Sequence, residues 1–394
     1  MDARFLFLSK THPFHGGGAE LRTWELAKRF VEFGSQVTIL TSEVGAPSDK
    51  PDSIAGVRFE YLPATPFAWS GIAQVAFLAP RVQFFLTRSP LLTELIVEDR
   101  PDLVHDDITP FPIIKANRLC LESEIPEVAT VHILRGRMLD WARIYGPVGV
   151  GGAVGEAMLR GGFLRYSHII TDSQWLRTDL LRDIAPGQVT WIPNGVNIDE
   201  FHPHGSHFTS TDVDLVRFLY VGRFIGWKGH RVLLEAFAGL LKEGVPAKLL
   251  LVGTGPDLEN IHRLCRDFQI EDHVSFLGWI PHSEMPTVYS RADVFVLPSA
   301  PEGLSVALIE AMSSGLAVVA SDFPGNRDVT GTSSALLTRH GDSEGLRAAM
   351  KKLAQDPDLR SRLGTAGRQT VVENFSWDRV AQAQFELFRK CVEA

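Results

Sequence analysis

The sequence predicts an α/β fold made of two domains, each built around a parallel sheet. Short apolar runs that fit buried strands alternate with segments of helical periodicity from residue 5 onward. The alternation starts again after a polar stretch at 202–214 that has no periodicity. At 394 residues the chain is also too long for one ordinary hydrophobic core. We therefore expect a first domain over 1–200, joined by a final helix at 376–394, and a second domain over 201–375.

Composition excludes several classes of protein. A hydrophobic content of 45% and a charged content of 22% are typical of globular proteins. The net charge of −8 argues against a nucleic-acid binder. Cys120, Cys265 and Cys391 lie far apart, so they predict neither a disulfide framework nor a metal site, and they favour a reducing compartment such as the cytoplasm.

The first half opens as strand (5–8), glycine loop, helix (21–33) and strand (36–40). Backbone amides at Gly17 and Gly18 could face a phosphate or a sugar, although a simple tight turn explains these glycines equally well. The fingerprint G-x-G-x-x-G is absent, which disfavours an NAD-linked enzyme.

Later strands of the first half are expected at 57–62, 101–105, 128–131, 167–171 and 188–192, with a mostly helical stretch at 72–97. Two strands end in polar residues, at Asp106-Asp107 and at His132, where parallel sheets bind ligands. The two aspartates either bind hydroxyl groups of an acceptor or cap the next segment, and His132 is either a ligand or a structural residue. Segment 138–166 is either a mobile loop or a helix that contacts a hydrophobic acceptor or a membrane surface.

The second half begins with a strand at 217–221, the loop Gly222–Gly229 and a helix at 230–241. Arg223 and Lys228 lie in this loop between a strand end and a helix start. Two cations among glycines suit a diphosphate whose negative charge grows as it leaves. Further strands are expected at 248–252 and 274–278, the first followed by a G-x-G turn that either approaches a nucleotide or only needs positive φ.

The stretch 294–320 predicts strand, loop, helix and strand, which is one parallel crossover. Glu302 lies in the loop after a strand end, where open α/β sheets bind ligands. Glu310 lies on an otherwise apolar helix, where a buried carboxylate is costly without a partner. The alternative is that Glu302 is a helix N-terminal charge and Glu310 belongs to a solvated face.

Together these motifs resemble the retaining GT-B glycosyltransferases of family four. The resemblance rests on the spacing E-x7-E at Glu302 and Glu310, on GR-x4-KG at Arg223 and Lys228, and on the turn PNGVN at 193–197. It implies a GT-B fold, in which two Rossmann-like domains face a central cleft and the final helix crosses back onto the first domain. It assigns the acceptor to the first domain and the nucleotide-sugar donor to the second.

The resemblance also implies roles for single residues. Glu302 would lie beside the donor sugar, and Glu310 would hold the ribose hydroxyls. The catalytic set would be Glu302, His132, Arg223 and Lys228, and the donor-binding set would be Gly17, Gly18, Arg223, Lys228, Gly303, Leu304 and Glu310. Two departures leave acceptor and donor choice open: His105-Asp106-Asp107 replaces the family's H-x-H, and 324–328 replaces its GG-x-PE.

The function implied is transfer of a sugar, with retained configuration, from a nucleotide-diphosphate sugar to a hydroxyl of a glycan, glycolipid or lipid-linked acceptor. Alternatives are a GT-B epimerase, a sugar-phosphate synthase, or a non-catalytic nucleotide-sugar binding protein. We expect no metal and no cofactor besides the donor substrate. The apolar stretch 67–85, interrupted by Arg81, predicts weak contact with the inner surface of a membrane by a cytoplasmic protein.

Overall fold

The computed structural model describes residues 2–9, 11–13, 17–43, 46–62, 90–107, 114–132, 165–203, 215–300 and 303–394. These residues form two compact units, one of Met1–Asn194 with Trp377–Ala394 and one of Gly195–Ser376. The chain enters the second unit a few residues earlier than the expected boundary after residue 200. The reason is local pairing, because the amide of Val196 donates to the carbonyl of Phe375 at 2.8 Å and Val196 bridges to Ser376.

The first unit contains an eight-stranded sheet in the order β3-β4-β2-β1-β5-β6-β7-β8. Its pairs are parallel except β3 with β4. The strands are β1 (Arg4–Leu8), β2 (Gln36–Ser42), β3 (Ser53–Ile54), β4 (Val57–Leu62), β5 (Leu103–Asp106), β6 (Glu127–Val131), β7 (His168–Thr171) and β8 (Val189–Trp191). The chain runs outward in one direction from β1 and in the other from β5, so the switch point of the sheet lies between these two strands.

Helices of the first unit are α1 (Gly18–Glu32), α3 (Pro90–Thr93) with the π-helical turn η2 (Glu94–Glu98), α4 (Ile114–Ser123), α7 (Gln174–Leu180) and α15 (Trp377–Glu393). Helix α7 starts after Ser173, whose side chain accepts a hydrogen bond from the amide of Leu176 and so caps the helix. Most of the helical stretch expected at 72–97 lies outside the described residues, and 90–98 is helical.

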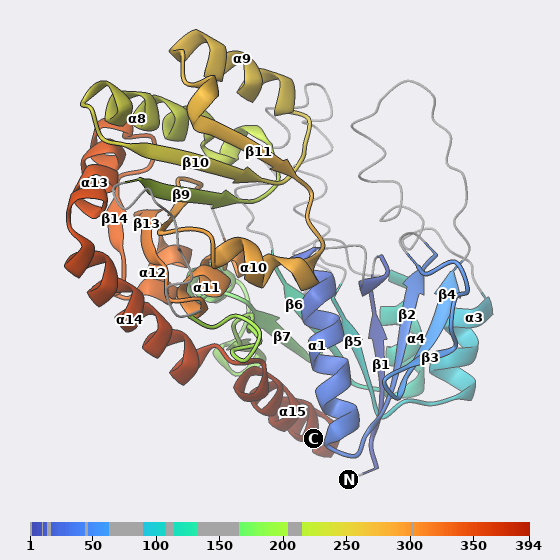
Figure 1. Ribbon diagram of the computed structural model, residues 1–394. Coiled ribbons are helices and arrows are strands. Elements are labelled where there is room, and N and C mark those ends of the chain that lie inside the picture. The colour runs from blue at the N-terminus through green and yellow to red at the C-terminus, as the bar shows by residue number, and fades with distance from the viewer. Residues whose placement is uncertain are drawn as a thin grey trace. The chain divides into compact units, whose positions relative to one another are not determined.

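The C-terminal helix α15 packs against α1 and the first sheet (Figure 1). Phe388 is fully buried, and its ring lies 5.6 Å from Phe5 and 5.5 Å from Phe30 between centroids. The ring of Phe385 meets that of Phe30 edge-on at 5.1 Å. Apolar burial and aromatic pairing therefore hold the last helix to the first unit, although the whole second unit separates them in sequence.

The second unit contains a six-stranded parallel sheet in the order β11-β10-β9-β12-β13-β14. The strands are β9 (Val216–Val221), β10 (Ala247–Val252), β11 (Val274–Gly278), β12 (Val294–Leu297), β13 (Ala317–Ser321) and β14 (Leu336–Thr338). The helices are α8 (His230–Lys242), α9 (Leu258–Phe268), α10 (Met285–Tyr289), α11 (Val306–Ser313), α12 (Pro324–Thr330), α13 (Ser343–Gln355) and α14 (Pro357–Asn374). Its switch point lies between β9 and β12, which places the loops after these two strands at the site that such sheets use for ligands.

The sequence therefore predicted the two-unit α/β architecture correctly. Within the described part of the chain, no helix is both long and apolar enough to cross a membrane.

Candidate functional site

The loops that follow β9 and β12 touch at the switch point of the second sheet. Gly229, the residue before α8, has a φ of +76°, and a Cβ atom built on it would lie 2.7 Å from the carbonyl oxygen of Pro298. Only glycine combines this left-handed backbone with so close an approach. The contact joins the loop that carries Arg223 and Lys228 to the segment that leads into α11.

The backbone around Arg223 is held by the loop that follows β10. The amide of Phe224 donates to the carbonyl of Thr254 at 2.8 Å, and the amide of Asp257 donates to the carbonyl of Phe224 at 3.0 Å. Gly253 packs so closely against the carbonyl of Gly222 that a Cβ atom would collide with it. The G-x-G turn thus positions the Arg223 loop, which is a structural reason for these glycines.

Two cations therefore lie on a fixed loop at the carboxyl edge. The Arg223 side chain is exposed, and Lys228 is half-buried at the end of the short 3-10 helix η5 (Gly226–Lys228). His230 is buried just after them, and burial together with the charge of Lys228 lowers its pKa to about 4. An anion at this loop would meet two positive charges beside the first turn of α8.

Glu310 on α11 is buried, with 4% of its surface exposed, and it has two partners that the sequence did not reveal. Nε2 of His282 lies 2.7 Å from its Oε1 atom, and the hydroxyl of Tyr289 donates to its Oε2 atom at 2.8 Å. These hydrogen bonds offset the cost of burying the carboxylate. Burial and the neighbouring charge of Glu310 raise the pKa of Tyr289, so its hydroxyl stays a donor.

Glu302 lies outside the described residues. Gly303 is half-buried, and Leu304 is 7% exposed just before α11, so the structure brings both to the start of the helix that carries Glu310.

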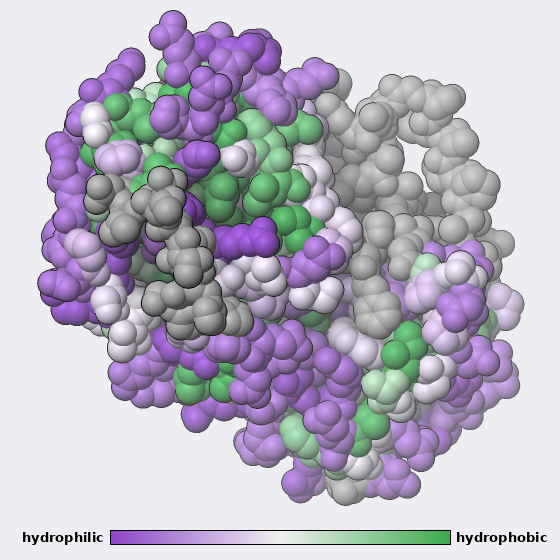
Figure 2. Space-filling view, viewed as in Figure 1, coloured by the Kyte–Doolittle hydropathy of each residue, from purple (hydrophilic) through white to green (hydrophobic). Residues whose placement is uncertain are grey.

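Apolar surface lies beside this edge of the second sheet. Leu277 and Trp279, at the end of β11, are 41% and 59% exposed. Figure 2 shows hydrophobic residues in the part of the view where Figure 1 places β10 and β11. Trp279 precedes the short helix η7 (His282–Glu284), whose first residue binds Glu310.

In the first unit, His132 lies between two carboxylates at the carboxyl edge of the sheet. Its Nε2 atom is 2.7 Å from Oδ1 of Asp107, and its Nδ1 atom is 3.0 Å from Oδ2 of Asp172. Burial disfavours the charged ring, but the two carboxylates outweigh burial and raise the pKa of His132 to about 9. At neutral pH the ring is therefore an imidazolium that donates to both partners.

A second layer of contacts fixes these groups. Thr23 of α1 donates its hydroxyl to Asp107 at 2.5 Å, and Tyr166 donates to Asp106 at 2.5 Å. Both aspartates are buried, and both accept hydrogen bonds from protein side chains in this structure. Their role toward an acceptor stays a prediction, as does the contact of His132 with a donor sugar.

Arg22 supplies the counter-charge from inside the same unit. It is fully buried and donates to the carbonyl of Pro193, to Asn194 and to Gln384 of α15 at 2.5, 3.2 and 2.6 Å. Burial lowers its pKa, while Asp107 and Asp172 oppose that shift. Arg22 therefore ties α1 and α15 to the turn that leaves the first unit. Sequence reasoning had not identified it.

Gly17 and Gly18 lie at the start of α1, three residues earlier than the helix was expected to begin. The carboxylate of Glu20 lies so close to Gly17 that a Cβ atom there would collide with it, and it accepts from the hydroxyl of Thr11 at 3.0 Å. A diphosphate at these amides would meet this carboxylate, which must move aside or be neutralised. The predicted role of the two glycines remains a prediction.

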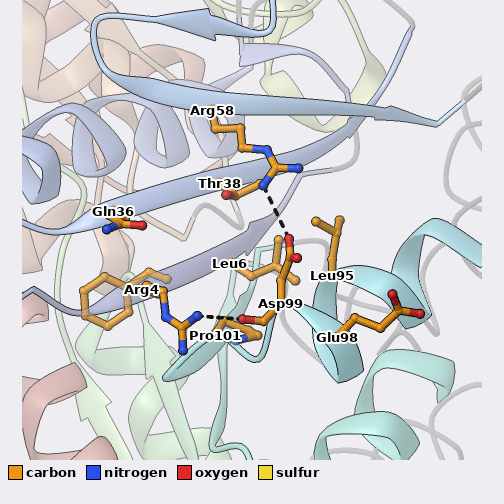
Figure 3. A pocket seen from close by; sticks show the side chains of 10 residues that line it. Arg4, Leu6, Gln36, Thr38, Arg58, Leu95, Glu98, Asp99 and Pro101 are labelled. Atoms are coloured by element: carbon orange, nitrogen blue, oxygen red, sulfur yellow. Dashed lines mark hydrogen bonds and ion pairs between the residues drawn. The ribbon is translucent and has the colours of Figure 1, made fainter.

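A cavity of about 360 Å³ lies at the opposite, amino edge of the first sheet (Figure 3). Arg4 donates to the carbonyl of Asp99 at 2.8 Å, and Arg58 reaches the carboxylate of Asp99 at 3.4 Å. Both Arg4 and Arg58 therefore already have partners on Asp99. None of the predicted site residues lines this cavity.

Two families match the chain in adjacent stretches. The family described as Glycosyltransferase Family 4 matches residues 16–200, and the one described as Glycosyl transferases group 1 matches residues 209–370.

Curated relatives match over part of their length. A GDP-mannose-dependent alpha-(1-6)-phosphatidylinositol monomannoside mannosyltransferase of Mycobacterium tuberculosis is 28% identical over 235 residues, which cover 55% of this chain and 60% of the relative. The lipopolysaccharide core biosynthesis glycosyltransferase LpsD of Rhizobium meliloti is 34% identical over 183 residues, which cover 46% and 52% of the two chains. The chain thus matches a little over half the length of these relatives.

Solved structures match over nearly the whole chain. A sucrose-phosphate synthase from Thermosynechococcus elongatus superposes with a TM-score of 0.80 at 23% identity and covers 98% of both chains. The Anabaena protein HepE, solved in complex with UDP and glucose, superposes with a TM-score of 0.75 at 18% identity and covers 98% of this chain and 100% of its own. At such identities the likeness is one of fold.

Proposed function

Because the chain belongs to the group 1 glycosyltransferases and has their GT-B type of fold, we propose that it transfers a sugar from a nucleotide-diphosphate donor to an acceptor hydroxyl. The acceptor class is a glycan, a glycolipid or a lipid-linked sugar, and the anomeric configuration is retained.

The observation that carries this proposal is the arrangement at the second switch point. Arg223 and Lys228 lie on a fixed loop, Gly229 joins that loop to Pro298, and the segment after Pro298 leads to the buried Glu310. Arg223 and Lys228, which could bind a diphosphate, follow β9, and Glu310, which could bind a diol, lies on the helix after β12. These two strands are neighbours in one sheet. These groups suit the diphosphate and the ribose of a nucleotide sugar.

The proposed chemistry breaks the bond between the anomeric carbon and the diphosphate oxygen and forms one to the acceptor oxygen. The leaving diphosphate gains negative charge, which Arg223 and Lys228 stabilise. With retention, the acceptor hydroxyl attacks from the face of the leaving group and gives its proton to the departing phosphate. Glu302 would stabilise positive charge that develops on the sugar.

The names of two relatives suggest the class of acceptor. Their names include a phosphatidylinositol monomannoside and a lipopolysaccharide core. We propose a lipid-linked or envelope acceptor and weak contact with anionic membranes by a cytoplasmic protein. Residues 67–85, on which that contact was predicted, lie outside the described residues. Co-sedimentation with anionic liposomes at low salt tests the contact, and absence of the protein from the pellet would contradict it.

The first experiment is a panel of UDP-, GDP- and ADP-sugars tested for stabilisation of the full chain by thermal shift. A donor at one hundred times its Kd should stabilise the fold by about 2.7 kcal/mol. Proton NMR of the product formed from that donor then gives the anomeric configuration. Stabilisation by no nucleotide sugar, or an inverted product, would contradict the corresponding part of the proposal.

A sugar-phosphate synthase is the second candidate, because structural likeness to sucrose-phosphate synthase covers nearly the whole chain. It uses the same donor chemistry with a sugar phosphate as acceptor. Turnover with sugar phosphates but not with glycan or lipid-linked acceptors would favour it.

A further inference from the structure

We infer that His282 and Tyr289 are positioning residues for the ribose of the donor. They fix the carboxylate of Glu310 so that one acceptor position on each of its oxygens is left for two neighbouring hydroxyl groups. The inference rests on the proposed function and adds the means by which this site selects a ribonucleotide.

The geometry of the carboxylate comes first. An ionised carboxylate has two oxygens with about four acceptor positions in total. Nε2 of His282 takes one at Oε1, 2.7 Å away, and the hydroxyl of Tyr289 takes one at Oε2, 2.8 Å away. Each oxygen is thus held by a different donor, which fixes rotation about the last side-chain bond. The positions that remain, one on each oxygen, match a vicinal diol.

The two donors differ in their surroundings. Tyr289 is fully buried, and its hydroxyl also lies 3.3 Å from the carbonyl of Ala307 on the same helix as Glu310. The His282 side chain is 41% exposed, so it lies at the solvent side of the carboxylate. Tyr289 therefore anchors Glu310 from the inside of the unit, and His282 orients it at the surface, where a ligand arrives.

Phe201 supports both donors. It is 1% exposed, and its ring lies 5.3 Å from the ring of His282 and 5.8 Å from the ring of Tyr289. Its carbonyl is held by the hydroxyl of Ser313 at 2.5 Å and by the guanidinium of Arg368 at 2.7 Å. The segment that enters the second unit is thus fixed against the residues that orient Glu310.

The test compares affinities for ribose and 2′-deoxyribose forms of one nucleotide. UDP, GDP and ADP are titrated into the full chain by calorimetry, and the tightest is compared with its 2′-deoxy counterpart. Hydrogen bonds to a charged group are worth about 1.5–3 kcal/mol, so the wild type should prefer the ribonucleotide by about tenfold to one hundredfold.

The His282→Ala and Tyr289→Phe variants should lose most of this preference, to about threefold or less. The His282→Gln variant keeps a donor near the position of Nε2 and should retain the preference. His340→Ala and Tyr61→Phe are matched controls outside this cluster and should behave as wild type. Tyr289→Phe removes a single hydroxyl, so it keeps the test valid even if His282→Ala folds poorly.

A merely structural role would weaken both nucleotides equally and leave the preference unchanged, which would overturn the inference. Glu310→Gln separates this failure from failure of the proposed function. If Glu310→Gln loses the preference while His282→Ala and Tyr289→Phe keep it, Glu310 binds ribose without this support and only the inference fails. If no nucleotide binds the wild type, the proposed function fails and the inference fails with it.

Discussion

His132 and Asp107 are joined by a 2.7 Å contact between Nε2 and Oδ1, although they are 25 residues apart and follow different strands. Strands β5 and β6 are parallel neighbours, so their carboxyl ends bring the two side chains to one edge of the sheet. Asp172, which follows β7, completes the cluster from the next strand along.

We first predict that His132 remains protonated far above the ordinary range of histidine. Its folded pKa is about 9, compared with 6.5 for the unfolded chain. The stabilisation is therefore fully present below pH 6.5 and is lost as pH rises through 9, and its size is on the order of 3 kcal/mol. NMR titration of the imidazole measures the pKa. The difference in unfolding free energy between wild type and His132→Gln should shrink over the same range, and a midpoint near pH 6.5 would contradict the assignment.

Second, Arg223→Ala and Lys228→Ala should each reduce turnover by about 2–4 kcal/mol of transition-state stabilisation, because each removes a charge that stabilises the leaving diphosphate. Their unfolding midpoints should stay close to wild type, since both lie in a surface loop. Arg231→Ala is the control, because Arg231 is an exposed cation on α8 that pairs with Glu235. Wild-type rates for both loop variants would show that this loop does not bind the diphosphate.

Third, two glycines with the same left-handed backbone allow the cost of that conformation to be distinguished from the effect of the contact with Pro298. Gly229 and Gly244 both have a φ of +76°, but only Gly229 lies against Pro298, while a Cβ atom on Gly244 would meet nothing within 4 Å. Alanine at either position should cost about 1–3 kcal/mol of stability for the left-handed backbone. Only Gly229→Ala should also weaken binding of nucleoside diphosphate in calorimetry, because it pushes the two loops apart. Equal affinities in the two variants would contradict the proposed contact site.

Much of the fold could be predicted from the sequence, because strand and helix periods and helix caps are local signals. The strand, helix and strand predicted within 294–320 are confirmed as β12, α11 and β13. The partners within each site were not predicted. The donor at His282 is 28 residues from Glu310, and no local pattern links two residues that only the packing of η7 against α11 brings together.

The boundary between the units could not be placed from the sequence either, because it too depends on residues that are distant in the chain. The polar stretch at 202–214 suggested a linker, but the chain joins the second unit at Gly195 through backbone pairing of Val196 with residues near 375. Such pairing depends on distant backbone atoms and carries no side-chain signature. Arg22 was missed for a related reason, since a basic residue on a predicted helix is usually solvated.

Fourth, Arg22→Met should destabilise the protein by about 3–5 kcal/mol, because it removes a buried positive charge near Asp107 and Asp172 and leaves three buried acceptors without their donor. Arg389→Met is the matched control on α15, where Arg389 forms an exposed pair with Glu393 and should contribute little. Urea unfolding followed by circular dichroism measures both variants. Equal midpoints for the two would show that the Arg22 network contributes no more than a surface pair.

We propose that the nucleotide sugar binds along one stretch of the second unit, with the sugar near Glu302 and the ribose at Glu310. The most direct measurement sets the calorimetric affinity for nucleoside diphosphate beside the acceptor-dependent turnover number for Glu302→Gln and Glu310→Ala. Glu310→Ala should weaken nucleotide binding by about 1.5–3 kcal/mol, because it removes charged hydrogen bonds to the diol. Glu302→Gln should keep nucleotide affinity and lose turnover, because it removes only the charge that stabilises the cationic sugar. A Glu302→Gln variant that loses nucleotide affinity and keeps its turnover number would contradict the account.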